Sequence, residues 1–328
     1  MSPAFSVIAL APTAPTAPTA PAAPVLPEDA APLVARAVAE AGLDLPEPVL
    51  GGHTPAVGDA GDDAGATGYA WVRWPLGELA DAAAVTMLRS VLRPDPVAQA
   101  VPGVDLAVVP DALHDGGRLL LIMDVDSTLI QQEVIEMLAA HAGREAEVAA
   151  VTDAAMRGEL DFAQSLHARV EALAGLPVRV IEEVVGMVRV SPGAERLVAA
   201  LLADGHRVAA VSGGFSQVLT PLAERLGLSH HRANLLGVAD GALTGRVEGT
   251  VVDRAVKAAN LREWAAQDGV VPDHVIAVGD GANDLDMLAA AGLSVAYNAK
   301  PALRHAAAAQ LNLPRLDAVG ALAGLPGF

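Results

Sequence analysis

A run of apolar residues, Leu119 to Met123, ends abruptly in two carboxylates, Asp124 and Asp126, that are separated by one residue. An unbroken apolar run of this length is typical of a strand that is buried on both faces, as in a parallel sheet. In open parallel sheets, ligands bind beyond the carboxyl ends of the strands. Because two neighbouring carboxylates repel each other, they need a cation or a shared proton. Mg²⁺ prefers oxygen ligands and commonly accompanies phosphate groups, so the pattern predicts a magnesium and phosphate site at this strand end.

Two later apolar runs end in the same manner, whereas a lone Asp-x-Asp also occurs in ordinary surface turns. The run at 208–211 leads into Ser-Gly-Gly, and the run at 275–278 leads into Gly-Asp-Gly-Ala-Asn-Asp. The polar or flexible residues supplied by these segments are Ser212, Gly213, Asp280, Asn283 and Asp284. Lys257 lies between the two runs, in a stretch with a helical pattern at 254–267. These are the residue types that phosphoryl transfer requires.

The composition excludes several classes of function. The chain of 328 residues has a net charge of −18, which disfavours nucleic acid and anionic membrane surfaces as partners. It contains no cysteine, so disulfides and thiolate metal sites are excluded. No apolar run is long enough to predict a transmembrane helix, and the N-terminus lacks the basic region of a signal peptide. We therefore expect a cytoplasmic protein with a small-molecule partner, and a homodimer stays open.

The N-terminal third of the chain divides into two predicted parts. Residues 10–24 repeat Ala-Pro-Thr or close variants, and proline at every third position blocks both helix and sheet. We therefore predict a disordered Ala/Pro-rich tail over residues 1–28. Residues 29–115 carry a short helical pattern, a Gly- and Asp-rich loop at 50–67, and a strand–helix–strand pattern, which together predict a small α+β domain.

The remainder, residues 118–328, alternates strands with helices, which predicts an α/β fold with a doubly wound, Rossmann-like parallel sheet. Several helical patterns follow one another at about 133–190 without an intervening strand. Because this stretch lies between the first and second strands, we expect it to form a helical cap over their carboxyl ends. Asp240-Gly241 predicts a hairpin turn further on.

The segments Asp124-Val-Asp-Ser-Thr, Ser212-Gly-Gly-Phe, Lys257 and Gly279-Asp-Gly-Ala-Asn-Asp resemble, in order and spacing, the four motifs of haloacid-dehalogenase-type phosphatases. The resemblance extends over about residues 118–310. It implies Mg²⁺ as the cofactor and hydrolysis of a small phosphomonoester through an aspartyl-phosphate intermediate. The N-terminal α+β domain loosely resembles the regulatory ACT-like domains of some members.

In the predicted cap, Glu133, the segment 156–162 and Arg169 resemble the substrate-reading residues of those family members that hydrolyse O-phospho-L-serine, the last step of serine biosynthesis. A carboxylate complements the ammonium group of phosphoserine, and a guanidinium complements its carboxylate. Glu133 and Arg169 are therefore predicted to bind the substrate. Met156 and Phe162 are predicted to form an apolar wall, although core packing explains them equally well.

The resemblance implies a role for each of the carboxylates. Asp124 would be the nucleophile and a metal ligand. Asp126 would donate a proton to the leaving alkoxide, later accept one from water, and ligate Mg²⁺ through its main-chain carbonyl. Asp280 would be the remaining carboxylate ligand. Asp284 would not ligate the metal directly but would hold a metal-bound water or position Lys257.

The other motif residues would bind the phosphoryl group. Ser212 and the Gly213 amide would grip its oxygens, Lys257 would add positive charge, and Asn283 would hydrogen-bond the substrate. Ordinary structural explanations stand beside these roles, because Lys257 could be a solvated helix lysine and Asn283 a helix cap. Glu133 and Arg169 could simply face water.

Two other functions stay open at this point. The same chemistry could act on another small phosphomonoester, such as phosphohomoserine or phosphothreonine. The chain could also be a catalytically inactive sensor that binds amino acids through its N-terminal domain.

Overall fold

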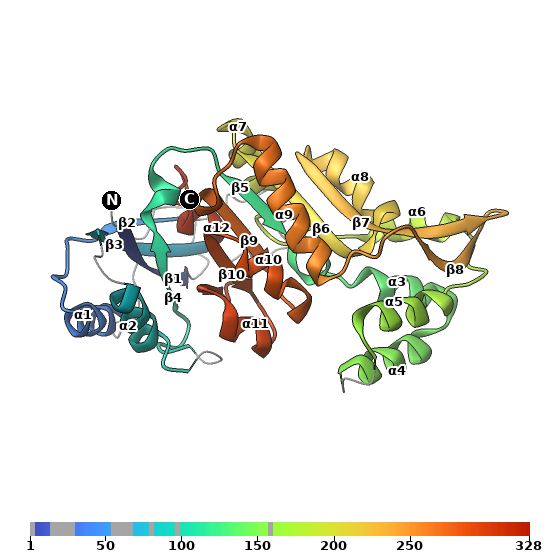
Figure 1. The fold of residues 1–328 in the computed structure, drawn as a ribbon, viewed down its shortest axis with the longest axis horizontal. Coiled ribbons are helices and arrows are strands. Elements are labelled where there is room, and N and C mark those ends of the chain that lie inside the picture. Colours follow the sequence, from blue (N-terminus) through green and yellow to red (C-terminus); the bar gives the residue numbers. More distant parts are fainter. Residues whose placement is uncertain (1–3, 14–29, 54–67, 79–81, 96–98, 157–159) are drawn as a thin grey trace.

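The computed structural model describes residues 4–13, 30–53, 68–78, 82–95, 99–156 and 160–328 (Figure 1). Its strands form two sheets, a four-stranded sheet near the N-terminus and a seven-stranded sheet in the remainder of the chain. Within the described ranges, no helix has the length and apolar character needed to cross a membrane.

The seven-stranded sheet has the strand order β11-β10-β9-β5-β6-β7-β8, and only the terminal pair β7–β8 is antiparallel. Its strands are β5 (Leu120–Met123), β6 (Arg207–Phe215), β7 (His230–Ala239), β8 (Ala242–Glu248), β9 (Val275–Gly279), β10 (Leu293–Tyr297) and β11 (Ala309–Leu311). The predicted turn at Asp240-Gly241 connects β7 to β8. The mostly parallel order, with helices on both faces, confirms the predicted doubly wound α/β fold.

The sheet is buried on both faces because successive side chains of a strand point in opposite directions. Along β5, Leu121 and Met123 join the hydrophobic core on one face, whereas Leu120 and Ile122 join the core on the other. The first core includes residues of α7 (Ala194–Ala203), α8 (Ser216–Leu226) and α12 (Ala318–Leu322). The second includes residues of α9 (Arg254–Asp268), α10 (Leu285–Ala289) and α11 (Pro301–Ala306). This two-sided burial explains the unbroken apolar run that precedes Asp124.

A helical insert stands between β5 and β6, where the sequence predicts a cap. Its helices are α3 (Val134–Ala142), α4 (Glu145–Met156), α5 (Phe162–Glu171) and α6 (Arg179–Met187). Its base is closed by a bridge between Ile130 and Val190, and the Gln131 amide donates a hydrogen bond to the Arg189 carbonyl at 3.0 Å. In Figure 1, α3, α4 and α5 form a separate green layer beside the sheet. The two chain crossings at this base join the insert to the sheet.

The N-terminal unit has the element order β1 (Ala4–Thr13), α1 (Ala30–Glu40), β2 (Val49–His53), β3 (Gly68–Glu78), α2 (Ala82–Leu92) and β4 (Asp105–Pro110). Its antiparallel sheet has the order β2-β3-β1-β4. A β-α-β-β-α-β unit of this kind is ferredoxin-like.

Two sequence-based predictions are wrong in this unit. Residues 4–13 are not part of a disordered tail but form β1, which pairs with both β3 and β4. The error arose from the adjacent proline repeat, which favours neither helix nor sheet. The apolar stretch before the repeat, from Val7 to Ala11, is buried in the sheet. The predicted loop at 50–67 begins too early as well, since residues 50–53 belong to the edge strand β2. Residues 14–28 and 54–67 lie outside the described residues.

The two sheets are joined where β4 lies alongside β11. Asp105, buried at the start of β4, accepts hydrogen bonds from the main-chain and side-chain nitrogens of Asn312 at 2.6 and 2.7 Å. On the same side, the Trp71 indole donates to the Phe328 carbonyl at 2.7 Å. These directional contacts fix the N-terminal unit against one end of the larger sheet (Figure 1).

Candidate active site

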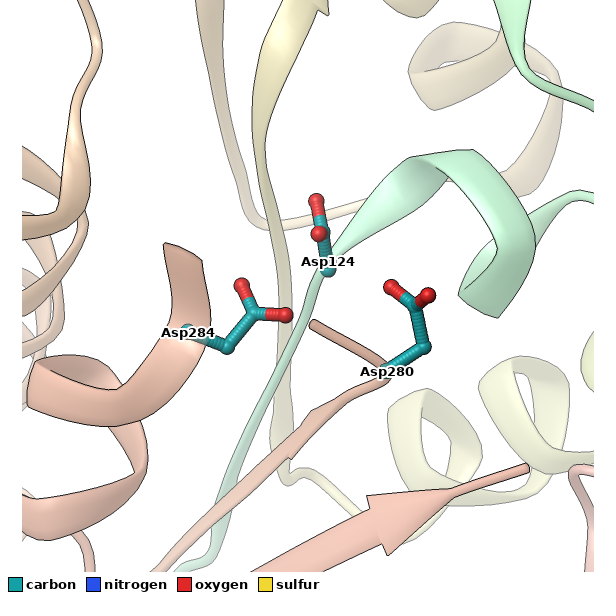
Figure 2. A group of neighbouring side chains, drawn as sticks. All are labelled: Asp124, Asp280 and Asp284. Carbon is teal, nitrogen blue, oxygen red and sulfur yellow. The ribbon is translucent and has the colours of Figure 1, made fainter. Parts of the chain in front are cut away.

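The predicted carboxylates meet because β5 and β9 are adjacent parallel strands whose carboxyl ends lie at one edge of the sheet. Asp124 follows β5 directly, and Asp280 follows β9. The Asp124 amide extends the ladder by donating to the Val278 carbonyl at 2.9 Å. Figure 2 shows Asp280 and Asp284 on either side of Asp124, and one carboxylate oxygen from each of the three lies within 4.8 Å of the others.

Lys257 lies beneath this group and has no exposed surface. It is on the first turn of α9, where the Asp253 side chain caps the helix by accepting from the Val256 amide at 2.9 Å. The Lys257 Nζ is 2.7 Å from Asp124 Oδ1 and 2.7 Å from Asp284 Oδ1. Although burial acts to lower the pKa of Lys257, the two carboxylates outweigh it and raise this pKa. The complete burial excludes the alternative of a solvated helix lysine.

Asp284 is also fully buried, and both of its oxygens have partners. One oxygen binds Lys257, and the other accepts from the Gly281 amide at 3.2 Å. Burial, followed by the charge of Asp124, raises the pKa of Asp284 to about 7. The predicted position behind the site, in contact with Lys257, agrees with these contacts.

The carboxylate group has the chemistry of a divalent metal site. Burial and the charge of Asp124 raise the pKa of Asp280 to about 6, although the exposed Lys300, 3.5 Å away, opposes the shift. Three carboxylates facing one buried lysine leave an excess of negative charge, which the raised pKa values reflect. A hard cation with oxygen ligands would offset that excess, so the cluster fits Mg²⁺, with Asp124 and Asp280 lining the cavity and Asp284 behind them.

Asp126 occupies a different environment, on the loop that follows β5. Its Oδ1 accepts from the Val134 amide at 2.8 Å, and its Oδ2 accepts from the Ser212 hydroxyl at 3.0 Å. Burial raises the pKa of Asp126 to about 7, with further contributions from the negative charges of Glu133 and Asp124. A carboxyl group that exchanges its proton near neutral pH is suited to general acid and base catalysis.

The Ser-Gly-Gly segment of β6 requires glycine at positions 213 and 214, because neighbouring side chains leave no space for a Cβ atom there. A Cβ atom on Gly213 would lie 2.8 Å from the Phe162 ring, and one on Gly214 would lie 2.7 Å from Asp126 Oδ2. The hydroxyl of Ser212 donates to Asp126 and accepts from the Gly214 amide at 2.7 Å. Gly213 and Gly214 line the site cavity, whereas Ser212 is buried and does not line it.

Asn283 contacts the predicted nucleophile directly. Its Nδ2 donates to Asp124 Oδ2 at 3.1 Å, while Asp124 Oδ1 receives the Val125 amide and Lys257. The Asn283 side chain is thus not a helix cap. It holds the Asp124 carboxylate in one orientation, a contact that the sequence pattern did not reveal.

A cavity of about 470 Å³ lies between the strand ends and the helical insert. The predicted residues that line it are Asp124, Asp126, Glu133, Phe162, Arg169, Gly213, Asp280 and Asn283. Glu133 precedes α3 and accepts from the Ser127 hydroxyl at 2.8 Å, while the Arg169 Nε donates to the Ser165 carbonyl at 3.2 Å on α5. The structure thus brings a carboxylate and a guanidinium of the insert to the same cavity as Asp124. The side chain of Met156 and residues 157–159 lie outside the described residues.

Three polar lining residues carried no site prediction in the sequence, namely Thr152, Arg254 and Lys300. Lys300 could have been found, because it follows the parallel strand β10 and ligands bind beyond the carboxyl ends of such strands. Arg254 is the first residue of α9, three positions before Lys257. Nothing in its local sequence distinguishes it from a surface arginine.

Comparisons with known proteins agree with this geometry. The sequence profile of haloacid dehalogenase-like hydrolases matches residues 121–289, just over half of the chain. A phosphoserine phosphatase of Streptomyces coelicolor is 58% identical over 223 residues, which are 68% of this chain and 54% of that protein. A phosphoserine phosphatase of Streptococcus thermophilus is 48% identical over 197 residues, 60% of this chain and 92% of that protein.

Among solved structures, a phospho-aspartyl intermediate analogue of phosphoserine phosphatase superposes with a TM-score of 0.59 at 40% identity, covering 62% of this chain and 97% of that one. The chain spans about half the length of the first curated relatives that it matches. The matched segment contains β5, the helical insert, β6 and the Gly-Asp-Gly segment after β9, which together build the cavity. The chain therefore belongs to the haloacid dehalogenase-like hydrolases.

Proposed function

We propose that the chain is a Mg²⁺-dependent phosphomonoesterase that hydrolyses O-phospho-L-serine to L-serine and phosphate. The observation that carries the proposal is the placement of Glu133 and Arg169 in one cavity with Asp124 and Asp126. Two charged groups of phosphoserine would find a complement there, the ammonium at Glu133 and the carboxylate at Arg169. The phosphate would lie beside Asp124, where Mg²⁺ would offset the repulsion between the two anions. The names of the relatives that match this part of the chain support the same substrate.

In the first chemical step, Asp124 attacks phosphorus and the bond from phosphorus to the serine oxygen breaks. Asp126, protonated up to near neutral pH, gives its proton to that oxygen, so that serine leaves as an alcohol. Asp126, now a carboxylate, then takes a proton from water, which attacks the phosphorus of the aspartyl-phosphate. Breakage of the bond from phosphorus to the Asp124 oxygen releases phosphate and restores both carboxyl groups.

The remaining residues hold the reacting groups in place. Lys257 and Asn283 fix the Asp124 carboxylate through the contacts described above, which reduces the freedom of the nucleophile before attack. The Gly213 amide and the Ser212 hydroxyl are proposed to bind the phosphoryl oxygens. Gly213 lines the cavity and would donate directly, whereas Ser212 would act through Asp126, to which its hydroxyl donates. Asp124, Asp280 and the main-chain carbonyl of Asp126 would hold Mg²⁺, with Asp284 behind them. When bound, the ion offsets the repulsion between the attacking carboxylate and the phosphate anion.

The substrate assignment is tested with two single variants, Glu133→Gln and Arg169→Lys. Each change should lower kcat/KM for O-phospho-L-serine by roughly 100-fold, because Gln removes the negative charge of Glu133 and Lys removes the paired donors of the Arg169 guanidinium. Turnover of p-nitrophenyl phosphate, which lacks the amino-acid groups, should fall less than about tenfold by the same reasoning. Glu145→Gln is the matched control, since Glu145 is exposed on α4 and does not line the cavity. Equal losses on both substrates would argue for another phosphomonoester.

The catalytic assignment is tested separately from the substrate. Incubation with BeF₃⁻ and Mg²⁺ should form a stable mimic of aspartyl-phosphate in the wild-type chain but not in Asp124→Asn. A chain that forms no such complex, yet binds free amino acids, would be an inactive sensor.

The wider setting is part of the same proposal. A role in serine biosynthesis implies a cytoplasmic location. We propose the residue 118–328 unit as the phosphatase domain, with its cap at about 133–190, and the ferredoxin-like unit as an ACT-like regulatory domain. A homodimer is compatible with this arrangement, and sedimentation velocity would determine it.

A further inference from the structure

A second cavity, of about 480 Å³, lies between the N-terminal unit and the catalytic unit. Its N-terminal side is formed by Arg89 of α2 and by Arg93, which directly follows that helix, and its other side by residues around β10 and α11, including Ser294 and His305. Figure 1 shows α2 facing this part of the larger domain, on the far side of the sheet from the helical insert. None of its lining residues also lines the active-site cavity.

Arg89 and Arg93 differ in their contacts. Arg93 donates to the carbonyls of Ala307 and Ala308 at 3.0 Å and to that of Arg304 at 2.8 Å, so it ties α2 to the segment after α11. Arg89 makes no hydrogen bond or ion pair with any described residue, and its Nε is buried without a partner. Burial lowers the pKa of Arg89, and the positive charge of Arg89 adds to the lowering at Arg93. Two guanidinium groups thus lie near each other with unused donors.

No acidic residue offsets this positive charge among the described residues that line the cavity. The chain as a whole has 39 acidic residues against 21 lysines and arginines, so a cavity lined by arginines and no carboxylate runs against its composition. Asp105 is the carboxylate whose charge reaches Arg93. Its Oδ1 is already bonded by Gln99 at 2.8 Å and by Asn312 at 2.7 Å, and it does not line the cavity.

We propose that this cavity binds a small oxyanion, through a phosphate or carboxylate group held between Arg89 and Arg93. Guanidinium groups present paired N–H donors in a geometry that matches such oxygens, and burial of the anion beside them would strengthen the contact. Ser294 and His305 add a hydroxyl and an imidazole to the catalytic side of the same cavity. A bound anion would therefore link α2 to the catalytic unit at a point where the described residues leave the Nε donors of Arg89 and Arg93 without a partner.

The test follows the arginine Nε–H signals of the full chain, labelled with ¹⁵N-arginine, by NMR during titration with inorganic phosphate and, separately, with succinate. The Arg89 signal is assigned by its loss in Arg89→Lys, and Arg89→Gln provides a second assignment. Arg36, exposed on α1, is the control for non-specific effects, and Arg169 reports independently on the active site.

We expect the Arg89 signal to shift to saturation with phosphate, succinate or both, at concentrations that leave Arg36 unchanged. Saturation with phosphate alone would identify a phosphate site, and saturation with succinate alone a carboxylate site. Shifts of Arg89 that merely parallel those of Arg36 with both anions would overturn the proposal. Arg169 lines only the active-site cavity, so its signal reports anion binding there separately from binding at Arg89. The result at Arg89 therefore does not depend on the proposed phosphatase activity.

Discussion

At the scale of single residues, the candidate site depends on the contrast between the only two lysines of the chain. Lys257 has no exposed side-chain surface and contacts two buried carboxylates, whereas 67% of the Lys300 side chain is exposed. Ion pairs in these two settings differ widely in their effect on stability. The sequence identified Lys257 through its place between two motifs, but burial could be learned only from the fold.

Lys257→Met should lower the free energy of unfolding by about 3–5 kcal/mol at pH 8, because Asp124 and Asp284 lose their buried counter-charge. The loss should be smaller at pH 6, where the raised pKa of Asp284 lets that carboxyl be neutral. Lys300→Met, the matched control, should cost at most about 1 kcal/mol. Urea unfolding without Mg²⁺ measures both variants, and similar losses would contradict the assigned ion pairs.

Protons should compete with Mg²⁺ at Asp280. Its pKa is raised to about 6, so the carboxyl group is largely protonated below pH 6 and must lose that proton when the metal binds. We expect the Kd for Mg²⁺, measured by isothermal titration calorimetry, to rise by about tenfold from pH 7 to pH 5. Asp280→Asn should bind more weakly and lose most of this pH dependence. An affinity that is the same at both pH values would remove Asp280 from the metal site.

At the scale of elements, Asn234 on β7 joins two parts of the site. Its Nδ2 donates to the Gly213 carbonyl at 2.8 Å, and its Oδ1 accepts from the Val252 amide at 2.7 Å, just before the α9 helix that carries Lys257. The residue is buried, and both of its contacts reach main-chain atoms far away in the sequence. It therefore holds the glycine loop at a fixed distance from the lysine helix.

Asn234→Ala should lower kcat by about tenfold or more and stability by about 1–3 kcal/mol, since two buried main-chain groups lose their partner. Gln217→Ala is the matched control, because Gln217 also bonds main-chain groups, the carbonyl and amide of Leu236, away from the site. It should cost similar stability in urea unfolding but leave kcat nearly unchanged. If both variants lost activity in proportion to stability, Asn234 would have no positioning role.

The elements that build the site were the most predictable part of the fold. The strands β5, β6 and β9 are marked by apolar runs that end in polar motifs, and their parallel pairing follows from the helices between them. β1 was missed because a proline repeat follows it, and β2 because its residues, Val-Leu-Gly-Gly-His, adjoin a Gly-rich stretch. Both strands depend for their stability on partners distant in the sequence, which local patterns do not record.

At the scale of the whole molecule, the junction of the two sheets could not be predicted. It depends on individual pairs such as Asp105 with Asn312 and Trp71 with the last carbonyl of the chain, which no periodicity announces. The anion cavity at the same junction was invisible in the sequence for the same reason. The catalytic cavity was more accessible, because one edge of the sheet gathers every motif, although its orienting contacts, such as Asn283 with Asp124, emerged only from the structure.

The most direct test of the account is phosphate release by the purified chain from a panel of small phosphomonoesters, with Mg²⁺ and with EDTA. The panel should include O-phospho-L-serine, phosphothreonine, phosphohomoserine and p-nitrophenyl phosphate. The account predicts Mg²⁺-dependent release with a marked preference for O-phospho-L-serine, abolished in Asp124→Asn. Release that persists in EDTA, or no release from any ester by the folded chain, would contradict it.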